Sequence, residues 1–197
     1  ETPHLLPHSP WTELCFSSVC AKLFRKSFVQ ANHLEFTGIR YAEDTLFNLH
    51  AFARHPQCAI IDYAGYFYFV NPSSITREKG TDRQLERTLS SLYRSFVDSP
   101  DYESLGQEGK WMVEYSYIAD MLSTILIFER GCGKEAMREK HRFFRTDLEA
   151  LFPEYRKNPF FTLRGPRGQR KAIRSGVSLF RLFDNLHLDS ALFVFFA

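Results

Sequence analysis

Two adjacent carboxylates, Glu43 and Asp44, stand directly ahead of a run of residues with helical spacing. A carboxylate at the start of a helix accepts backbone N–H bonds and meets the positive end of the helix dipole, and both interactions favour its ionised form. An ionised carboxylate is also what a general base requires at neutral pH. Asp44 is therefore either a helix cap or a candidate base. Glu43 is a solvated neighbour or a second ligand-binding group, and Asn48, one turn beyond Asp44, faces the same ligand or water.

The helix that must carry these groups is predicted over residues 43–54. Its apolar residues recur at three- and four-residue steps: Leu46, Leu49, Phe52 and Ala53. The helix is expected to stop at His55, because Pro56 disfavours helical geometry at the residue before it.

The segments on either side of this helix are of mixed type. Upstream, residues 11–36 combine apolar and basic side chains in a pattern typical of one or two short amphipathic helices. Downstream, residues 58–70 are rich in Ile, Tyr, Phe and Val, which predicts one or two β-strands interrupted at Gly65. The first domain is therefore expected to be mixed α/β and to cover residues 1–77.

Residues 78–152 have the pattern of a small helical bundle. A capping box of Thr81 and Gln84 precedes the first apolar stripe. A second stripe begins at Trp111, and a third ends before Pro153. The predicted fold class is α+β and mostly α-helical, with a partial α/β segment followed by this bundle.

The last segment, 153–197, is basic and then aromatic. Between residues 156 and 181, eight Lys and Arg residues occur without any acidic residue. One interpretation is a solvated terminus; another is a segment on an anionic membrane with its Phe and Leu residues in the interface. Nucleic acid is disfavoured, because no aromatic residues are interleaved with the basic ones as stacking platforms. Alternatively, Phe180 and Phe183 pack on the bundle.

Composition sets further limits. The 197 residues are 44% hydrophobic with a net charge of +2, which is typical of a globular protein. No apolar stretch is long enough to span a bilayer, and we expect a cytoplasmic location or a peripheral one at the inner face of the plasma membrane. The four cysteines lack metal-ligand spacing and are expected to be free, buried thiols in a reducing compartment. His50 and His55 are expected to cap the helix or lie on the surface rather than bind metal.

Four short motifs, taken together and in order, resemble a known family. They are AKLFRKSFV, LEF, YAEDTLFN and YFYFVNPSSIT. They make residues 19–77 similar to the second half of the family 2 glycosyltransferases, bacterial enzymes that build surface polysaccharides. The resemblance implies a partial GT-A-like α/β segment within residues 1–77.

The resemblance also implies roles for particular residues. Asp44 would be the general base that deprotonates an acceptor hydroxyl, which then attacks the anomeric carbon of the sugar with inversion. Glu43 and Asn48 would bind the acceptor. Lys22 and Arg25 would face phosphates, or else they lie on a solvated helix face.

The chain departs from the family in what it lacks. Family members begin with a nucleotide-binding half whose Asp-x-Asp motif holds a divalent cation on the donor diphosphate, and no Asp-x-Asp occurs here. Cys20 and Ala21 also stand where the family has a tryptophan before Lys-Leu-Phe. The chain alone is therefore expected to be inactive, and the Mg²⁺ or Mn²⁺ of a complete enzyme would find no ligands in it.

Two functions follow as expectations. The first is the C-terminal portion of an inverting glycosyltransferase, which transfers a sugar from a nucleotide-sugar donor to a saccharide or lipid-linked acceptor. The second is a non-catalytic helical interaction or membrane-docking module derived from such an enzyme.

Overall fold

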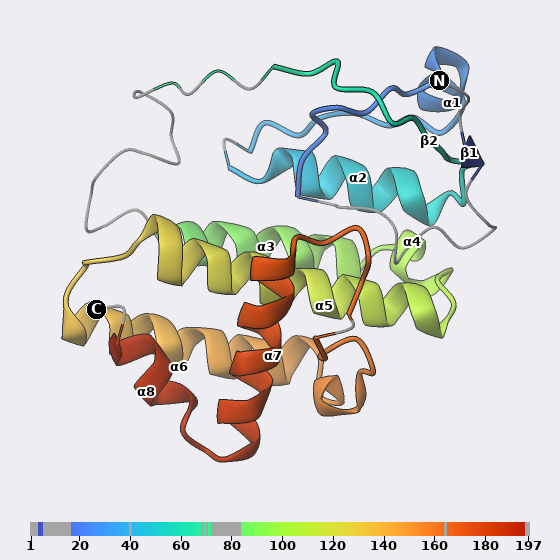
Figure 1. Ribbon diagram of the computed structural model, residues 1–197. Coiled ribbons are helices and arrows are strands. Elements are labelled where there is room, and N and C mark those ends of the chain that lie inside the picture. Colours follow the sequence, from blue (N-terminus) through green and yellow to red (C-terminus); the bar gives the residue numbers. More distant parts are fainter. Residues whose placement is uncertain are drawn as a thin grey trace.

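The computed structural model describes residues 4–5, 17–39, 41–67, 69, 71, 84–163 and 165–195. This part of the chain is mostly helical, which confirms the mostly α-helical part of the predicted fold class. Figure 1 shows two layers, with a bundle of helices below and, above it, a layer in which α2 lies under extended chain.

The bundle is built from the helices that follow residue 84. Their bounds are α3 Leu85–Val97, α4 Pro100–Glu103, α5 Gln107–Ser123, the π-helical turn η2 Thr124–Phe128, α6 Lys134–Leu151, the 3-10 turn η3 Tyr155–Lys157, α7 Lys171–Asn185 and α8 Asp189–Phe195. The three predicted stripes correspond to α3, α5 with η2, and α6. Gln84 is the N-cap residue of α3, but its side chain makes no cap bond, and Thr81 lies outside the described residues.

Buried tyrosines fix how the bundle helices meet. The Tyr117 hydroxyl on α5 donates a hydrogen bond of 2.6 Å to Asp147 on α6. The Tyr93 hydroxyl on α3 donates one of 2.8 Å to Asp120 on α5. A buried hydroxyl without a partner costs about 1–3 kcal/mol, so these bonds favour one rotation of each helix over the others.

The basic and aromatic tail forms the two helices α7 and α8. Figure 1 shows α7 crossing in front of the bundle, and its side chains Val177 and Phe180 are 1% and 2% exposed. The packing of Phe180 against Phe144 of α6 confirms the alternative in which this aromatic residue joins the bundle. Phe183 packs against the same core but is only partly buried.

The upper layer contains α1 Lys26–Ala31, α2 Glu43–Ala53, and a two-residue antiparallel pairing of β1 His4–Leu5 with β2 Ala59–Ile60. Helix α2 confirms the helix predicted over 43–54. Residues 61–67 are exposed and belong to no strand, so the strands predicted over 58–70 are wrong for this stretch and are found only at β2, while Tyr68 and Val70 lie outside the described residues. A strand needs a neighbour for its N–H and C=O groups, and β propensity alone does not supply one. A GT-A-like α/β segment is accordingly not seen in the described residues.

Helix α2 is buried on two sides. Leu46, Leu49 and Phe52 join the main core together with residues of α3 and α5. Phe47 and Ala51 pack with Leu34 on the other side, under the upper layer. Each fully buried Leu or Phe contributes about 1.5–3 kcal/mol, so this helix links the upper layer firmly to the bundle. The predicted boundaries at residues 77 and 152 stay predictions, and the segments they separate share one core.

Candidate functional site

Asp44 lies in the first turn of α2. Its side chain is half-buried, and Oδ2 accepts a hydrogen bond of 3.2 Å from the backbone N–H of Val19. The N-cap position is held by Ala42 in the left-handed region, with φ 61°, and no side chain caps this end of the helix. Asp44 is therefore not the cap of its own helix, and its carboxylate instead ties α2 to the segment 17–25.

Cys20 and Lys22 lie at the same end of α2. The Tyr66 hydroxyl donates a hydrogen bond of 3.1 Å to Cys20 Sγ. Hydrogen bonds from Ser18 and Tyr66 lower the pKa of the Cys20 thiol, and the positive charge of Lys22 lowers it slightly further. The slight burial of the thiol and the negative charge of Asp44 raise the pKa but do not cancel this effect. The thiol therefore interacts electrostatically with both Asp44 and Lys22, so the three groups lie close together.

The two predicted acceptor-binding residues differ in burial. Glu43 precedes Asp44 in the first turn and is half-buried. Asn48 is 0% exposed. A ligand at Asp44 can therefore contact Glu43 directly, whereas contact with the Asn48 amide requires a change in packing.

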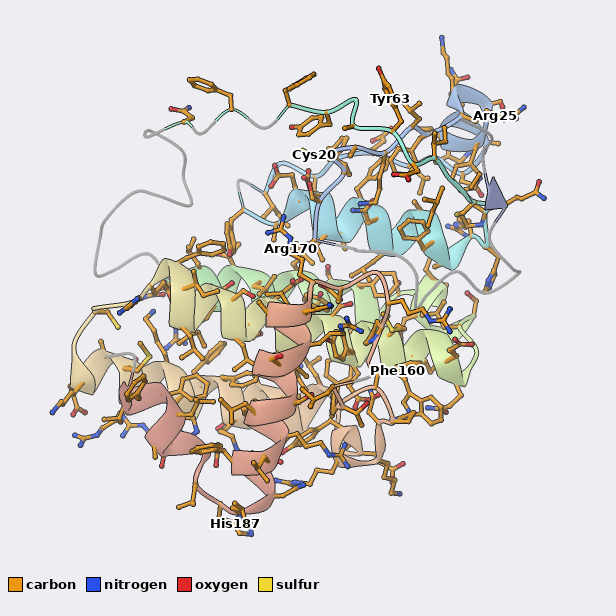
Figure 2. The ribbon with its side chains drawn as sticks, viewed as in Figure 1. Cys20, Arg25, Tyr63, Phe160, Arg170 and His187 are labelled. Carbon is orange, nitrogen blue, oxygen red and sulfur yellow. The ribbon has the colours of Figure 1, made fainter. Side chains whose placement is uncertain are left out.

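The two predicted phosphate-facing residues are also placed differently. Lys22 is half-buried, and its Nζ donates to the carbonyl oxygen of Ser18. Arg25 is exposed at the N-cap position of α1, away from Cys20 (Figure 2). The structure thus brings Lys22, Glu43 and Asp44 to one end of α2 and leaves Arg25 apart.

Large apolar side chains are exposed on the extended chain that reaches Cys20 through Tyr66. We call this surface the aromatic ridge; its members are Ile60, Ile61, Tyr63, Tyr66, Phe67 and Phe69. Phe67 and Phe69 are 91% and 84% exposed. Large exposed apolar side chains gathered on one segment are typical of a site that meets another molecule or another part of a protein.

A cleft of about 210 Å³ lies toward the other end of α2. His50 Nδ1 lies 2.7 Å from Asp101 Oδ2, and an Arg54 guanidinium nitrogen lies 3.0 Å from Asp101 Oδ1. The edge of the His50 ring also contacts Phe96, with ring centroids 5.1 Å apart. A histidine whose Nδ1 is held by a carboxylate can accept a proton at Nε2, so this pair is a second candidate base.

The sequence did not point to this pair, because His50 and Asp101 are 51 positions apart. The only local signal was the position of His50 in the last turn of a predicted helix, which suggested capping. Asp44 does not line this cleft, and it does not line a second, apolar groove between α5 and α7.

The described residues supply no group of three or more His, Cys, Asp or Glu side chains that could hold a metal ion. Cys20, Cys58 and Cys132 are free thiols, as predicted, but the predicted burial is wrong, because Cys20 is exposed and the other two are half-buried. Cys15 lies outside the described residues.

Two buried carboxyl groups of α5 are further residues that the sequence did not reveal. Burial raises the pKa of Glu114 to about 7, although a hydrogen bond from Asn158 opposes the shift. Asp120 keeps some exposed surface, but protein surrounds its carboxyl group. This desolvation raises the pKa of Asp120 to about 7, although the hydrogen bond from Tyr93 opposes the shift. Shifted pKa values mark functional sites or buried structural contacts. Both groups contact bundle residues, which favours the structural role.

Comparisons of the chain with models of known protein families, with curated proteins and with solved structures found no match. The similarity to family 2 glycosyltransferases therefore rests on the order of the four sequence motifs. Among the residues that the structure describes, no helix is long and apolar enough to cross a membrane.

Proposed function

We propose that this chain is the acceptor-side and helical portion of an inverting glycosyltransferase, with Asp44 as the general base. The observation that carries the proposal is the position of Asp44 in the first turn of α2, within the motif YAEDTLFN. In the described residues, Oδ2 is the Asp44 oxygen that accepts a hydrogen bond from the protein, which leaves Oδ1 for an incoming hydroxyl group.

The proposed reaction is a single displacement. Asp44 takes the proton of an acceptor hydroxyl as that oxygen forms its bond to the anomeric carbon. The bond from this carbon to the nucleoside diphosphate breaks at the same time, and the diphosphate leaves with the electron pair, which inverts the configuration. Glu43 orients the acceptor, and Lys22 adds positive charge at the same end of α2.

The other components of the reaction come from outside the described residues. In this proposal the donor is a nucleotide sugar, held together with its Mg²⁺ or Mn²⁺ by groups other than the described residues. The acceptor is a saccharide or a lipid-linked saccharide of a surface polysaccharide. In this proposal the protein works in the cytoplasm, at the inner face of the plasma membrane.

The test compares two carboxylate variants of the full-length natural protein. Asp44→Asn removes the base but keeps the shape of the side chain, so transfer from a nucleotide sugar should fall by about 10²–10⁴-fold while donor binding is retained. Asp62→Asn is the matched control, because Asp62 is an exposed carboxylate of the same layer. Turnover that survives in Asp44→Asn would refute the base assignment, and an intact protein without any sugar transfer would refute the function.

The aromatic ridge favours a second candidate, a non-catalytic interaction or docking module. Its exposed side chains suit contact with a further domain or partner whether or not sugar transfer takes place. A titration of the full-length protein with nucleotide sugars separates the two candidates. Saturable donor binding supports the enzyme, and its absence in a folded protein supports the module.

A further inference from the structure

Helix α7 carries two apolar stripes rather than one. The inner stripe contains Val177 and Phe180 and is buried in the bundle. The outer stripe contains Leu179, Leu182 and Leu186, which are 42%, 54% and 58% exposed. Their spacing of three and four residues places them on one face of the helix, which is the face turned to solvent. Packing against the described residues does not explain this stripe of leucines.

The turn that follows α7 extends the outer stripe. Leu188, between α7 and α8, is 52% exposed, and the neighbouring His187 lies at the far end of α7 in Figure 2. Ile127 of η2 is 59% exposed. Several large apolar side chains from α7, its turn and η2 are therefore exposed to solvent.

An apolar groove of about 220 Å³ runs beside the outer stripe. Side chains of α5, η2, α7 and α8 line it, among them Leu122, Leu126, Ile127, Leu179 and Leu192. Gly176 also lines it, and a Cβ atom added at Gly176 would meet nothing within 4 Å. The groove therefore has open space next to the backbone of α7.

The exposed charges of residues 165–195 are all positive. Arg170 and Lys171, at the start of α7, are exposed. The two acidic residues of this segment, Asp184 and Asp189, are only 1% and 7% exposed. Asp184 is neutralised by Arg145 and Arg156, and Asp189 lies 2.7 Å from His141. Cations and leucines without exposed acids suit an anionic amphiphile, whereas a second copy of this chain would bring like charges together.

From these observations we propose that the outer face of α7 and the α7–α8 turn dock on an anionic lipid bilayer, and that the groove beside Gly176 receives an acyl chain. Arg170 and Lys171 would contact the lipid headgroups. The leucines of the outer stripe would enter the interface between headgroups and chains. This inference does not depend on the role of Asp44, and it holds for both candidate functions.

The test is co-sedimentation of the 197-residue chain with phosphatidylcholine vesicles that contain or lack phosphatidylglycerol. The chain should bind the anionic vesicles and be released by salt, because screening weakens attraction between exposed charges. Equal binding to neutral vesicles, or no binding to either, would overturn the proposal. Self-association of the chain that excludes lipid would assign the face to a second copy and would overturn it as well.

Three variants locate the contact. Leu182→Glu should weaken vesicle binding by about tenfold or more, whereas Leu23→Glu, at a side chain 98% exposed on the upper layer, should not. Lys171→Ala should weaken binding about fivefold, which corresponds to one cation at the membrane surface. Unchanged binding by either Leu182→Glu or Lys171→Ala, with circular dichroism and thermal unfolding as in the parent, would overturn the proposed face.

A further variant tests whether the groove receives an acyl chain. Gly176→Phe places a bulky side chain at the groove, where an added Cβ atom meets nothing within 4 Å, and should weaken binding several-fold. Gly38→Phe is the matched control, because a Cβ atom at Gly38 also meets nothing within 4 Å. If the two variants bind alike, the acyl-chain part of the proposal fails even if the surface part holds.

Discussion

His50 Nδ1 lies 2.7 Å from Asp101 Oδ2, and this contact joins the last turn of α2 to the first turn of α4. Asp101 also pairs with Arg54, so one mostly buried carboxylate holds two basic side chains from the same end of α2. We expect Asp101→Asn to lower the free energy of unfolding by about 1–2 kcal/mol, because the amide cannot replace both charge-assisted contacts. Urea unfolding measures the change, and an unaltered midpoint would show that the contact is not stabilising.

Variants of His50 and Asp44 distinguish the two candidate bases. His50→Gln keeps a polar side chain but removes the basic nitrogen, and under the proposed function it should leave sugar transfer by the full-length protein within about threefold of the parent. Asp44→Asn should reduce it by about 10²-fold or more. The opposite pattern would move the base from Asp44 to His50.

Glu114 predicts a pH dependence of stability. Its pKa is raised to about 7 by burial, so between pH 4.5 and 7 the folded state binds a proton that the unfolded state has released. Stability contributed by this group is therefore present at low pH and lost as pH rises through 7. Glu114→Gln should flatten the decline between pH 4.5 and 7, whereas Glu103→Gln, at an exposed position of α4, should keep the parent slope. Identical slopes in the parent and both variants would contradict the buried-carboxyl assignment.

Lys140 stands between two buried carboxylates. Its Nζ lies 2.9 Å from Glu86 Oε2 and 3.1 Å from Glu129 Oε2, and all three side chains are at most 8% exposed. Lys140→Met would leave the two carboxylates without their cation, at an expected cost of about 3–5 kcal/mol. Arg138→Met, which removes an exposed pair with Glu135, should cost less than about 1 kcal/mol. Chemical denaturation of the two variants makes the comparison, and equal costs would contradict the burial of the triad.

Burial and the neighbouring Glu86 carboxylate raise the pKa of Glu129 in the same triad. Glu129→Gln should therefore destabilise far less than Lys140→Met, and its effect should turn toward stabilisation as pH rises, because the amide carries no charge to bury. A pH-independent loss of stability in Glu129→Gln would contradict this account.

Cys20 should be the most reactive of the three described thiols. Hydrogen bonds from Ser18 and Tyr66 lower its pKa, while burial raises the pKa of Cys58 and Cys132. Since the thiolate is the nucleophile, iodoacetamide should modify Cys20 first at neutral pH, as followed by peptide mass spectrometry.

Two variants connect this reactivity to the proposed site. Tyr66→Phe should slow the alkylation of Cys20, because it removes the hydrogen bond of 3.1 Å. Asp44→Asn should accelerate it, because the negative charge of Asp44 raises the thiol pKa. A rate that is insensitive to Asp44→Asn would show that the two side chains do not lie together as the structure has them.

The sequence alone determined the helices and the main buried faces. The three- and four-residue spacing of apolar residues located α2, α3, α5 and α6, because an amphipathic helix needs its apolar residues on one side and this is a local property. Gly131 and Gly133, between the π-helical turn and α6, have positive φ, a backbone conformation that glycine adopts at little cost. The pair Glu43 and Asp44 was also correctly placed in a first helical turn.

The tertiary structure decided which distant groups meet. The strands predicted over 58–70 depended on neighbours that the sequence could not name, and among the described residues of this range only Ala59 and Ile60 pair with another strand. The partners of His50 and Asp184, and Glu86 as one partner of Lys140, come from positions more than 20 residues away, and no local pattern encodes such pairings. The outer stripe of α7 could be recognised as exposed only from the structure, which shows the inner stripe buried in the bundle. Local spacing fixes which helix face is apolar, but packing against the rest of the chain decides which apolar side chains stay in contact with water.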